Sequence, residues 1–133
     1  MTNFTKNMMI AAAAMLSAVG MAQAQTITAE VPFGFRAAGT VMPAGSYRWQ
    51  EIASGSVAVF KLTNEDSGHA ILTIPMARNS VKLGTAPSLT FQCSGHDCSL
   101  LRVTPGDGAA YEIKTPGLGK DSRLAVIRAV LAR

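Results

Sequence analysis

The chain has few of the residues that most often carry enzyme chemistry or bind metals. It contains two histidines and two cysteines among 133 residues, and charged residues make up only 15% of the sequence. Its net formal charge is +4, and the Lys and Arg residues are scattered along the chain. A nucleic-acid-binding protein normally presents a clustered basic surface, so we expect no nucleic-acid partner.

The chain also lacks an apolar run long enough to predict a membrane-spanning helix. The N-terminal run from Met8 to Ala22 is rich in alanine and shorter than the roughly 18 residues that suggest a span. Lys6 precedes it and Ala22-Gln23-Ala24 follows it as an A-x-A site, a combination typical of a secretory signal peptide. No cysteine follows this site, so lipid attachment is not predicted.

These features predict a signal peptide over residues 1–24 and a single domain over residues 25–133, exported to the periplasm or the extracellular space. An uncleaved N-terminal anchor is the alternative. The mature part would have 109 residues and a net formal charge of +3. A chain of that length suits one domain with one core, and we expect no stable membrane span after cleavage.

The strongest strand pattern begins the mature chain. Apolar residues alternate with polar or small ones over residues 27–35, which is the period of a strand with one buried face. Pro43 and Gly45 then predict a turn, after which Tyr47 and Trp49 fall on one face of a second strand. The alternation slips after Trp49, which predicts a β-bulge or the end of that strand.

Five further segments have the composition of strands, and glycine- or proline-containing turns separate most of them. In the segment of residues 69–76, we expect Ala70, Leu72, Ile74 and Met76 to share one face. Pro75 places the end of this segment at a sheet edge. The sequence therefore predicts an all-β fold, a β-sandwich or partly closed β-barrel of about seven antiparallel strands. The five segments are residues 56–62, 69–76, 88–93, 98–103 and 109–114.

Two segments fit this pattern less well. Residues 77–87 have no clean period and are predicted to be a connection, with Val81 and Leu83 docked on the core. For residues 120–133 we expect a short helix capped by Asp121 or Ser122, because alanine and leucine favour helices. Its apolar stripe would contain Leu124, Ile127, Val130 and Leu131; a strand through Leu124, Val126 and Arg128 is the alternative.

Cys93 and Cys98 are predicted to form a disulfide. An exported protein meets an oxidising compartment, and residues 94–97 have the length of a short hairpin loop that would bring the two cysteines opposite each other. The rival hypothesis is a metal site of Cys93, His96, Cys98 and His69. Its spacing does not match the paired C-x₂₋₄-C pattern of zinc sites, so we expect no metal and no cofactor.

No motif predicts catalysis. His96 next to Asp97 could suggest a general base with its carboxylate, but turn chemistry accounts for both residues. Ser94 and Ser99 are not in a G-x-S-x-G elbow, and residues 117–120 do not have the spacing of a phosphate-binding loop. We therefore predict that the protein is not an enzyme.

Binding is the function that the composition favours. Tyr47 and Trp49 could form an aromatic surface for a sugar or an apolar peptide, although both also suit a buried core. The apolar segment from Leu124 to Leu131 is the best candidate for self-association. We predict a non-enzymatic binding module with an unknown ligand or envelope protein as partner. A structural component of the cell envelope, assembled through an edge strand or this C-terminal segment, is the alternative.

The motifs VPFGF and MPAGSY, with the cysteine hairpin PSLTFQCSGHDCSLLRV, resemble an uncharacterised family of small exported β proteins common in Acidobacteria. That family has a VPF-x-F strand and an L/M-P-A-G-x-Y corner. This chain departs from the pattern at Gly34, a position that is often acidic in the family, and in its less charged C-terminus. The resemblance implies export and a β fold, and it carries over no functional residue.

Overall fold

The computed structural model describes residues 26–53, 57–114 and 122–131. Within these ranges the chain forms twelve β-strands in two sheets, and no residue is helical. The described part of the chain therefore contains no helix that could cross a bilayer. The predicted signal peptide and residues 117–120 lie outside the described ranges.

The first sheet has the strand order β12-β1-β4-β5-β6, and all of its pairs are antiparallel. Each of β1, β4 and β5 sends alternate side chains into the core, as the alternation in the sequence predicts. The strands are β1 (Thr26–Val31), β4 (Gly45–Ala53), β5 (Val59–Asn64), β6 (Ala70–Thr73) and β12 (Val130–Leu131).

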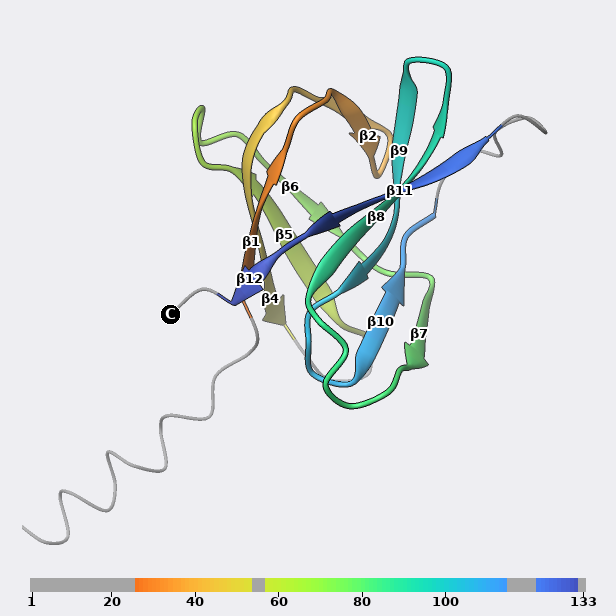
Figure 1. Cartoon of the computed structure of the whole chain (residues 1–133). Helices are drawn as coiled ribbons and strands as arrows, with labels where there is room; N and C mark the ends of the chain where they lie inside the picture. Colours follow the sequence, from red (N-terminus) through yellow and green to blue (C-terminus); the bar gives the residue numbers. More distant parts are fainter. Residues whose placement is uncertain (1–25, 54–56, 115–121, 132–133) are drawn as a thin grey trace, which may run out of the picture.

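The second sheet has the order β11-β8-β9-β10-β7, and the small β2–β3 hairpin joins it through a parallel contact between β2 and β9. Figure 1 shows the two sheets as facing layers, with β11 and β12 running along one side. The strands are β2 (Phe35–Ala37), β3 (Thr40–Met42), β7 (Ala77–Ser80), β8 (Ser88–Ser94), β9 (Asp97–Thr104), β10 (Ala109–Glu112) and β11 (Arg123–Arg128).

The core between the sheets is rich in aromatic contacts. Trp49 stacks on Phe60 with ring centroids 4.8 Å apart, and Phe60 in turn contacts Tyr111 of the opposite sheet at 4.6 Å. Phe35 packs edge-on against both Tyr47 and Phe91 at 5.0 Å. Aromatic pairs in such geometry add to the stabilisation from area burial alone, so these rings join the two sheets.

The β-sandwich prediction is confirmed, and the alternative of a partly closed barrel is wrong because the strands form two separate sheets. The seven predicted strands correspond to β1, β4, β5, β6, β8, β9 and β10. Of the other five strands, β11 is the strand through Leu124, Val126 and Arg128 that was the alternative to a C-terminal helix, and β2, β3, β7 and β12 were not predicted. The 77–87 segment predicted to be a connection contains one of them, β7, which pairs with β10.

The predicted C-terminal helix is wrong. Residues 123–128 form β11, which pairs with β8 at the edge of the second sheet, and Val130–Leu131 form β12, which pairs with β1 at the edge of the first. Ala129, which is buried, is the single residue between them. Both sheets offer unpaired backbone groups at these edges, and this tertiary pairing overrides a weak helix propensity. We call the segment Arg123–Leu131 the C-terminal bridge.

Two irregularities redirect side chains within the long strands. The ladder between β4 and β5 shifts register between Glu51 and Ala53, at the position where the sequence predicted a bulge. The ladder between β8 and β9 shifts after Thr90, so that Leu100 rather than Leu101 points into the core beside Val103. An extra residue on one strand of an antiparallel pair has this effect on the alternation.

The side chains of β6 and of the residues after it that face the core are not the ones predicted. Thr73 is buried, whereas Leu72, Ile74 and Met76 are 60–66% exposed, so the predicted apolar face points outward. Leu83, predicted to dock on the core, is 84% exposed. Pro75 follows the end of β6 at the sheet edge, as expected. The core side of β6 is therefore the side with Ile71 and Thr73.

Candidate functional site

His96 and Asp97 lie where the sequence placed them, in the turn between β8 and β9. The turn is tighter than predicted, because Ser94 and Asp97 already pair and only Gly95 and His96 form the loop. Both His96 and Asp97 are exposed, and no hydrogen bond among the described residues involves either side chain. The two side chains line a hollow together with Phe33, Arg36 and Val41, but no described group orients the imidazole in the way that a general base requires.

Cys93 and Cys98 form the predicted disulfide across the first rung of this hairpin, with a Cα–Cα distance of 4.0 Å. Both are at least nine-tenths buried. The thiolates that a metal site would need are therefore not available. No group of three or more His, Cys, Asp or Glu side chains within the described ranges is arranged to hold a metal ion.

Tyr47 and Trp49 do not form an exposed aromatic surface, because both are 1% exposed. They point inward from β4, and the Tyr47 hydroxyl donates a hydrogen bond to the Pro43 carbonyl oxygen. Burial raises the pKa of the Tyr47 phenol, Asp66 raises it further, and a hydrogen bond with Asn64 opposes both. The alternation that places these rings on one face of β4 is the same alternation that buries them.

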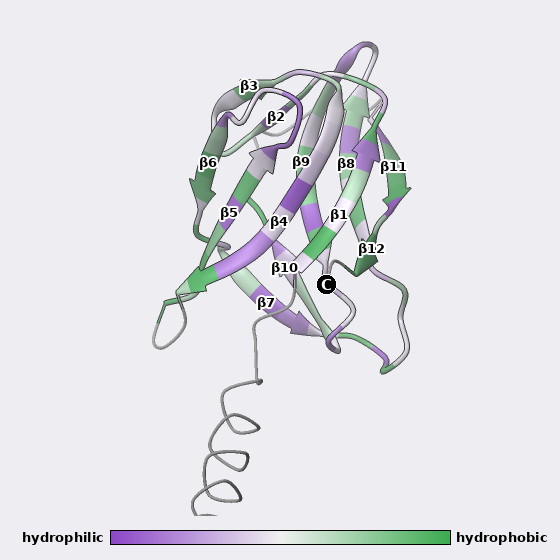
Figure 2. Cartoon of the chain, turned by 90° about the vertical axis from the view of Figure 1, so that its left-hand side faces the viewer, coloured by the Kyte–Doolittle hydropathy of each residue, from purple (hydrophilic) through white to green (hydrophobic). Residues whose placement is uncertain are grey.

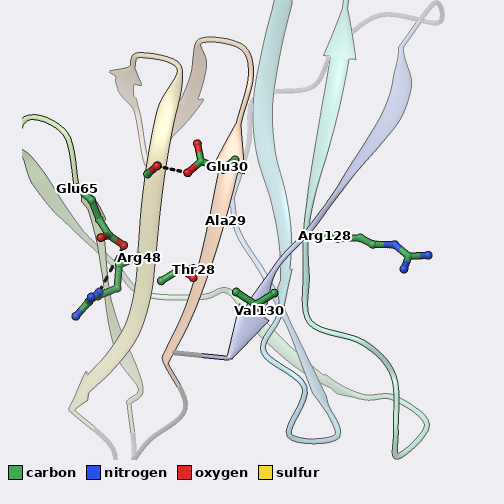
Figure 3. A pocket seen from close by; sticks show the side chains of 8 residues that line it. Thr28, Ala29, Glu30, Arg48, Glu65, Arg128 and Val130 are labelled. Carbon is green, nitrogen blue, oxygen red and sulfur yellow. Dashed lines mark hydrogen bonds and ion pairs between the residues drawn. The ribbon is translucent and has the colours of Figure 1, made fainter. Parts of the chain in front are cut away.

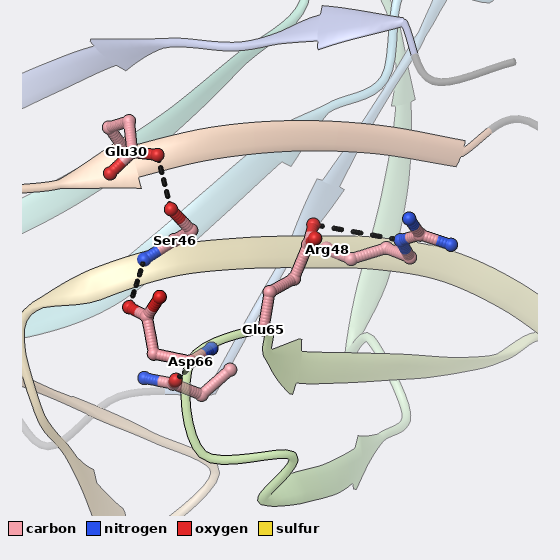
Figure 4. A network of polar contacts seen from close by, with 6 residues as sticks. Glu30, Ser46, Arg48, Glu65 and Asp66 are labelled. Carbon is pink, nitrogen blue, oxygen red and sulfur yellow. Dashed lines mark hydrogen bonds and ion pairs between the residues drawn. The ribbon is translucent and has the colours of Figure 1, made fainter.

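Residues 42–45, which we call the MPAG corner, lead into β4 and are fixed there by the turn between β5 and β6. Asn64 accepts hydrogen bonds from the Asp66 and Ser67 amides at 2.9 and 3.0 Å, which is an Asx-type turn. Asp66 accepts one from the Ser46 amide at 3.2 Å (Figure 4). A Cβ on Gly45 would lie 2.6 Å from the Asp66 carboxylate, so this close approach requires glycine. The corner residues that carry the family resemblance thus have structural roles.

A groove on the outer surface beside β1 and the C-terminal bridge is the first of three further hollows. Three of its charged side chains already have partners: Glu30 accepts from the Ser46 hydroxyl, and Arg48 pairs with Glu65 at 3.7 Å. Figure 3 shows that Arg128, at the far wall, points away from these groups. Because its polar groups do not converge, this groove has no arrangement that would select a ligand.

A second hollow lies on the outer face of the other sheet. Its floor includes Thr90 and Thr104, and Arg102 donates to Glu112 at 2.6 Å, while the Asn79 amide lies 3.3 Å from the same carboxylate oxygen. This charge-assisted network crosses β9, β10 and β7 and satisfies its own members. The described residues that line this hollow include no aromatic side chain of the kind that stacks on sugars.

The third hollow lies between the edge strands β6 and β7, where the chain crosses from one sheet to the other. We call it the lateral cleft. It has a volume of about 350 Å³ and is the hollow in which apolar side chains dominate. Its principal lining residues are Val57, Ile74, Pro75, Met76, Arg78 and Tyr111.

The floor and walls of the lateral cleft have different characters. Tyr111 is 5% exposed and connects the cleft to the stacked Phe60 and Trp49 rings of the core. Val57, Ile74 and Met76 in the walls are 53–66% exposed. Figure 2 shows the hydrophobic colour of β6 at one margin of the sandwich and of β11 and β12 at the other. Clustered exposed apolar side chains around a concavity are typical of interaction sites.

Among the described residues that line the lateral cleft, Arg78 is the single charged one. It pairs with Tyr111 across β7 and β10, so both side chains lie on the same side of the sheet, and its guanidinium carbon is 5.9 Å from the Tyr111 ring centroid. No carboxylate in the described part of the chain forms an ion pair with it. The guanidinium therefore retains donors that can face the cleft.

Sequence analysis missed this cleft. The signal was present in HAILTIPM, in which the apolar residues occupy both alternating positions at Ile71 and Leu72, so that one apolar set had to remain outside. The alternation alone did not indicate which set is buried. Arg78 and Tyr111 are 33 positions apart in the sequence, and only the pairing of β7 with β10 brings them together.

Comparison with models of known families, with curated proteins and with solved structures found no match to this chain. The resemblance to small exported β proteins therefore stays a prediction from the sequence motifs.

Proposed function

We propose that the protein is an exported, non-enzymatic binding module that holds an apolar ligand in the lateral cleft. One observation supports this function above others: three large apolar side chains remain exposed around a concavity with an aromatic floor. Ligand sites are usually concave and mostly apolar, with few polar groups. The disulfide and the N-terminal segment support export, because disulfides persist in oxidising compartments.

The choice of an apolar ligand follows from a comparison of the lateral cleft with the two hollows on the outer faces of the sheets. In the groove beside β1 and in the hollow over β8–β10, Glu30, the pair Arg48–Glu65 and the pair Arg102–Glu112 are already engaged in polar contacts. A polar ligand would have to displace those contacts, which carry a desolvation cost when left unpaired. In the lateral cleft, an apolar ligand would remove Ile74 and Met76 from water without breaking any contact of this kind.

The proposal is tested with the neutral fluorescent probe N-phenyl-1-naphthylamine and two matched double variants. We expect Ile74→Ser/Met76→Ser to weaken probe binding about tenfold or more, because two apolar walls become polar. Leu124→Ser/Val126→Ser removes two side chains of similar exposure from the opposite side and should bind as the wild type does. Thermal unfolding verifies that both variants fold. Absence of binding by the wild type, or equal binding by the two variants, would refute the proposal.

Assembly into a structural component of the cell envelope is the second candidate. It is favoured by the C-terminal bridge, which forms an edge of both sheets and exposes Leu124, Val126, Val130 and Leu131 by 52–66%. Exposed edge strands are templates for further pairing. A second β11 paired antiparallel about its middle would, however, place Arg123 opposite Arg128, and like charges in that position are destabilising.

The same variants distinguish this candidate. If the C-terminal bridge drives assembly, light scattering after size exclusion should show a concentration-dependent increase in mass. Leu124→Ser/Val126→Ser should abolish that increase, and Ile74→Ser/Met76→Ser should leave it unchanged. A mass that stays monomeric at all concentrations would count against self-assembly.

A further inference from the structure

We infer that the ligand of the lateral cleft is a medium-chain fatty acid bound as a monomer, with its carboxylate on Arg78 and its chain along Ile74, Met76 and the Tyr111 ring. This inference rests on the proposed function and adds the chemical class of the ligand. It depends on the position of one cation at the mouth of an otherwise uncharged hollow.

The first step is the placement of Arg78. Its neighbours in the ladder put it on the inward side of the edge strand β7, opposite Tyr111. An inward charge on an edge strand also discourages unwanted strand pairing, and that role would require no ligand. Arg78 differs from such a residue in one respect, because it lines a hollow whose other walls are apolar.

The second step is the sign of the charge. The groove beside β1 contains both acids and bases, with Arg48 paired to Glu65, and Arg102 in the hollow over β8–β10 is paired with Glu112. Among the described residues that line the lateral cleft, Arg78 is the one charged residue, and no described carboxylate forms an ion pair with it. A cationic ligand is thus disfavoured, and a planar carboxylate matches the fork of a guanidinium.

The third step is the shape of the apolar part. A volume of about 350 Å³ is at the small end of ligand sites, which excludes large ring systems. The walls include Met76 and Ile74, and a thioether side chain adapts readily to a flexible aliphatic chain. Tyr111 then provides an apolar floor, because its ring continues into the core.

The test compares three ligands of equal chain length: decanoate, decanol and decyltrimethylammonium. Displacement of the fluorescent probe gives their relative affinities for the wild type, Arg78→Gln, Arg78→Lys and Lys82→Gln. Lys82 is exposed and is not among the described residues that line the cleft. Lys82→Gln therefore removes the same charge as Arg78→Gln but outside the cleft, and it serves as the matched control. We expect decanoate to bind the wild type about tenfold more tightly than decanol, the effect of one charge-assisted hydrogen bond.

In Arg78→Gln this preference should disappear while decanol binding remains, and Arg78→Lys should retain part of it. Lys82→Gln should behave as the wild type. Equal binding of decanoate and decanol by the wild type would overturn the fatty-acid inference and leave the apolar-ligand function standing. If no ligand and no probe binds, both fail together.

Two further outcomes would also overturn the inference. The first is binding to phosphatidylglycerol vesicles without binding of monomeric decanoate, which would make the cleft a membrane-contact surface. The second is a dimer that Ile74→Ser/Met76→Ser dissociates and decanoate does not, which would make a second copy of the chain the occupant.

Discussion

The two lateral sides of the sandwich, where an edge of one sheet faces an edge of the other, are crossed by the chain in different ways. On one side the C-terminal bridge passes from β11 to β12 through Ala129 alone, and this residue is buried. On the other side the chain passes from β6 to β7 through Ile74, Pro75 and Met76, and the two apolar side chains point outward.

The number of crossing residues explains why only one side is open. A one-residue crossing keeps the edges of the two sheets close, and the Ala129 amide is satisfied by the Pro87 carbonyl at 3.0 Å. The three-residue crossing contains Pro75, which has no amide to donate. Its residues Ile74, Pro75 and Met76 line the lateral cleft. A sandwich can therefore use one side for stability and the other for binding.

The largest effect expected from this comparison concerns the two crossings. Ala129→Asn should destabilise the protein by about 3 kcal/mol, because it overpacks a buried position and buries a side-chain amide without a hydrogen-bond partner. Ala77→Asn, the same change beside the lateral cleft, should cost less than about 0.5 kcal/mol, since Ala77 is exposed. Urea unfolding of both variants measures the difference. Equal losses of stability in the two variants would contradict the difference between a closed and an open side.

The next effect is that of the disulfide, which supports the closed side. Cys93 pairs with Arg123 of the C-terminal bridge as well as with Cys98. Reduction should lower the free energy of unfolding by about 2 kcal/mol in the chain-entropy model for so small a ring, without changing probe binding in the lateral cleft. A Cys93→Ala/Cys98→Ala variant should no longer respond to reductant. Loss of binding on reduction would indicate that the two sides are coupled.

A smaller cost is expected at the MPAG corner, whose polar contacts join the start of β4 to the turn between β5 and β6. Gly45→Ala should destabilise the protein by about 1–2 kcal/mol, because the new Cβ displaces the Asp66 carboxylate from the Ser46 amide. Gly34→Ala, in the VPFGF motif, should change stability little. Its new Cβ would lie 3.5 Å from the Met42 carbonyl oxygen, which is an ordinary van der Waals contact. In an Asp66→Ala background most of the Gly45→Ala cost should vanish, as a double-mutant cycle would measure.

Much of the fold could be predicted because most central strands bury one face. The alternation of β1 and β4 gave their strands and the inward side, and the hairpin that carries Cys93 and Cys98 followed from turn and redox chemistry. Both signals are local. The bulge after Glu51 was also visible, since an inserted residue interrupts a period of two.

The candidate site could not be predicted, for two physical reasons. In β6 and β11 both faces carry apolar residues, so alternation does not identify the buried side, and in β11 the leucine and alanine content favoured a helix instead. The lateral cleft lies where the chain passes from β6 at the edge of one sheet to β7 at the edge of the other. That position depends on topology, which the pairing of β7 with β10 and of β6 with β5 determines.

The smallest effect distinguishes the two buried tyrosines, Tyr47 next to the MPAG corner and Tyr111 in the lateral cleft. Burial, assisted by the Asp66 carboxylate, raises the pKa of the Tyr47 phenol above its ordinary value of 10.0. The folded protein thus holds this proton more tightly than the unfolded chain. The corresponding stability is complete below about pH 10 and is lost as the pH rises through the raised folded pKa.

Tyr47→Phe removes this titration together with the hydrogen bond to the Pro43 carbonyl. We expect a loss of about 1 kcal/mol at neutral pH and a shrinking difference from the wild type above about pH 10. Tyr111→Phe, which leaves Tyr47 in place, should retain the alkaline fall in stability. Urea unfolding across this pH range provides the measurement. If Tyr47→Phe kept the full fall and Tyr111→Phe lost it, the alkaline sensitivity would belong to the open side of the sandwich and not to the corner.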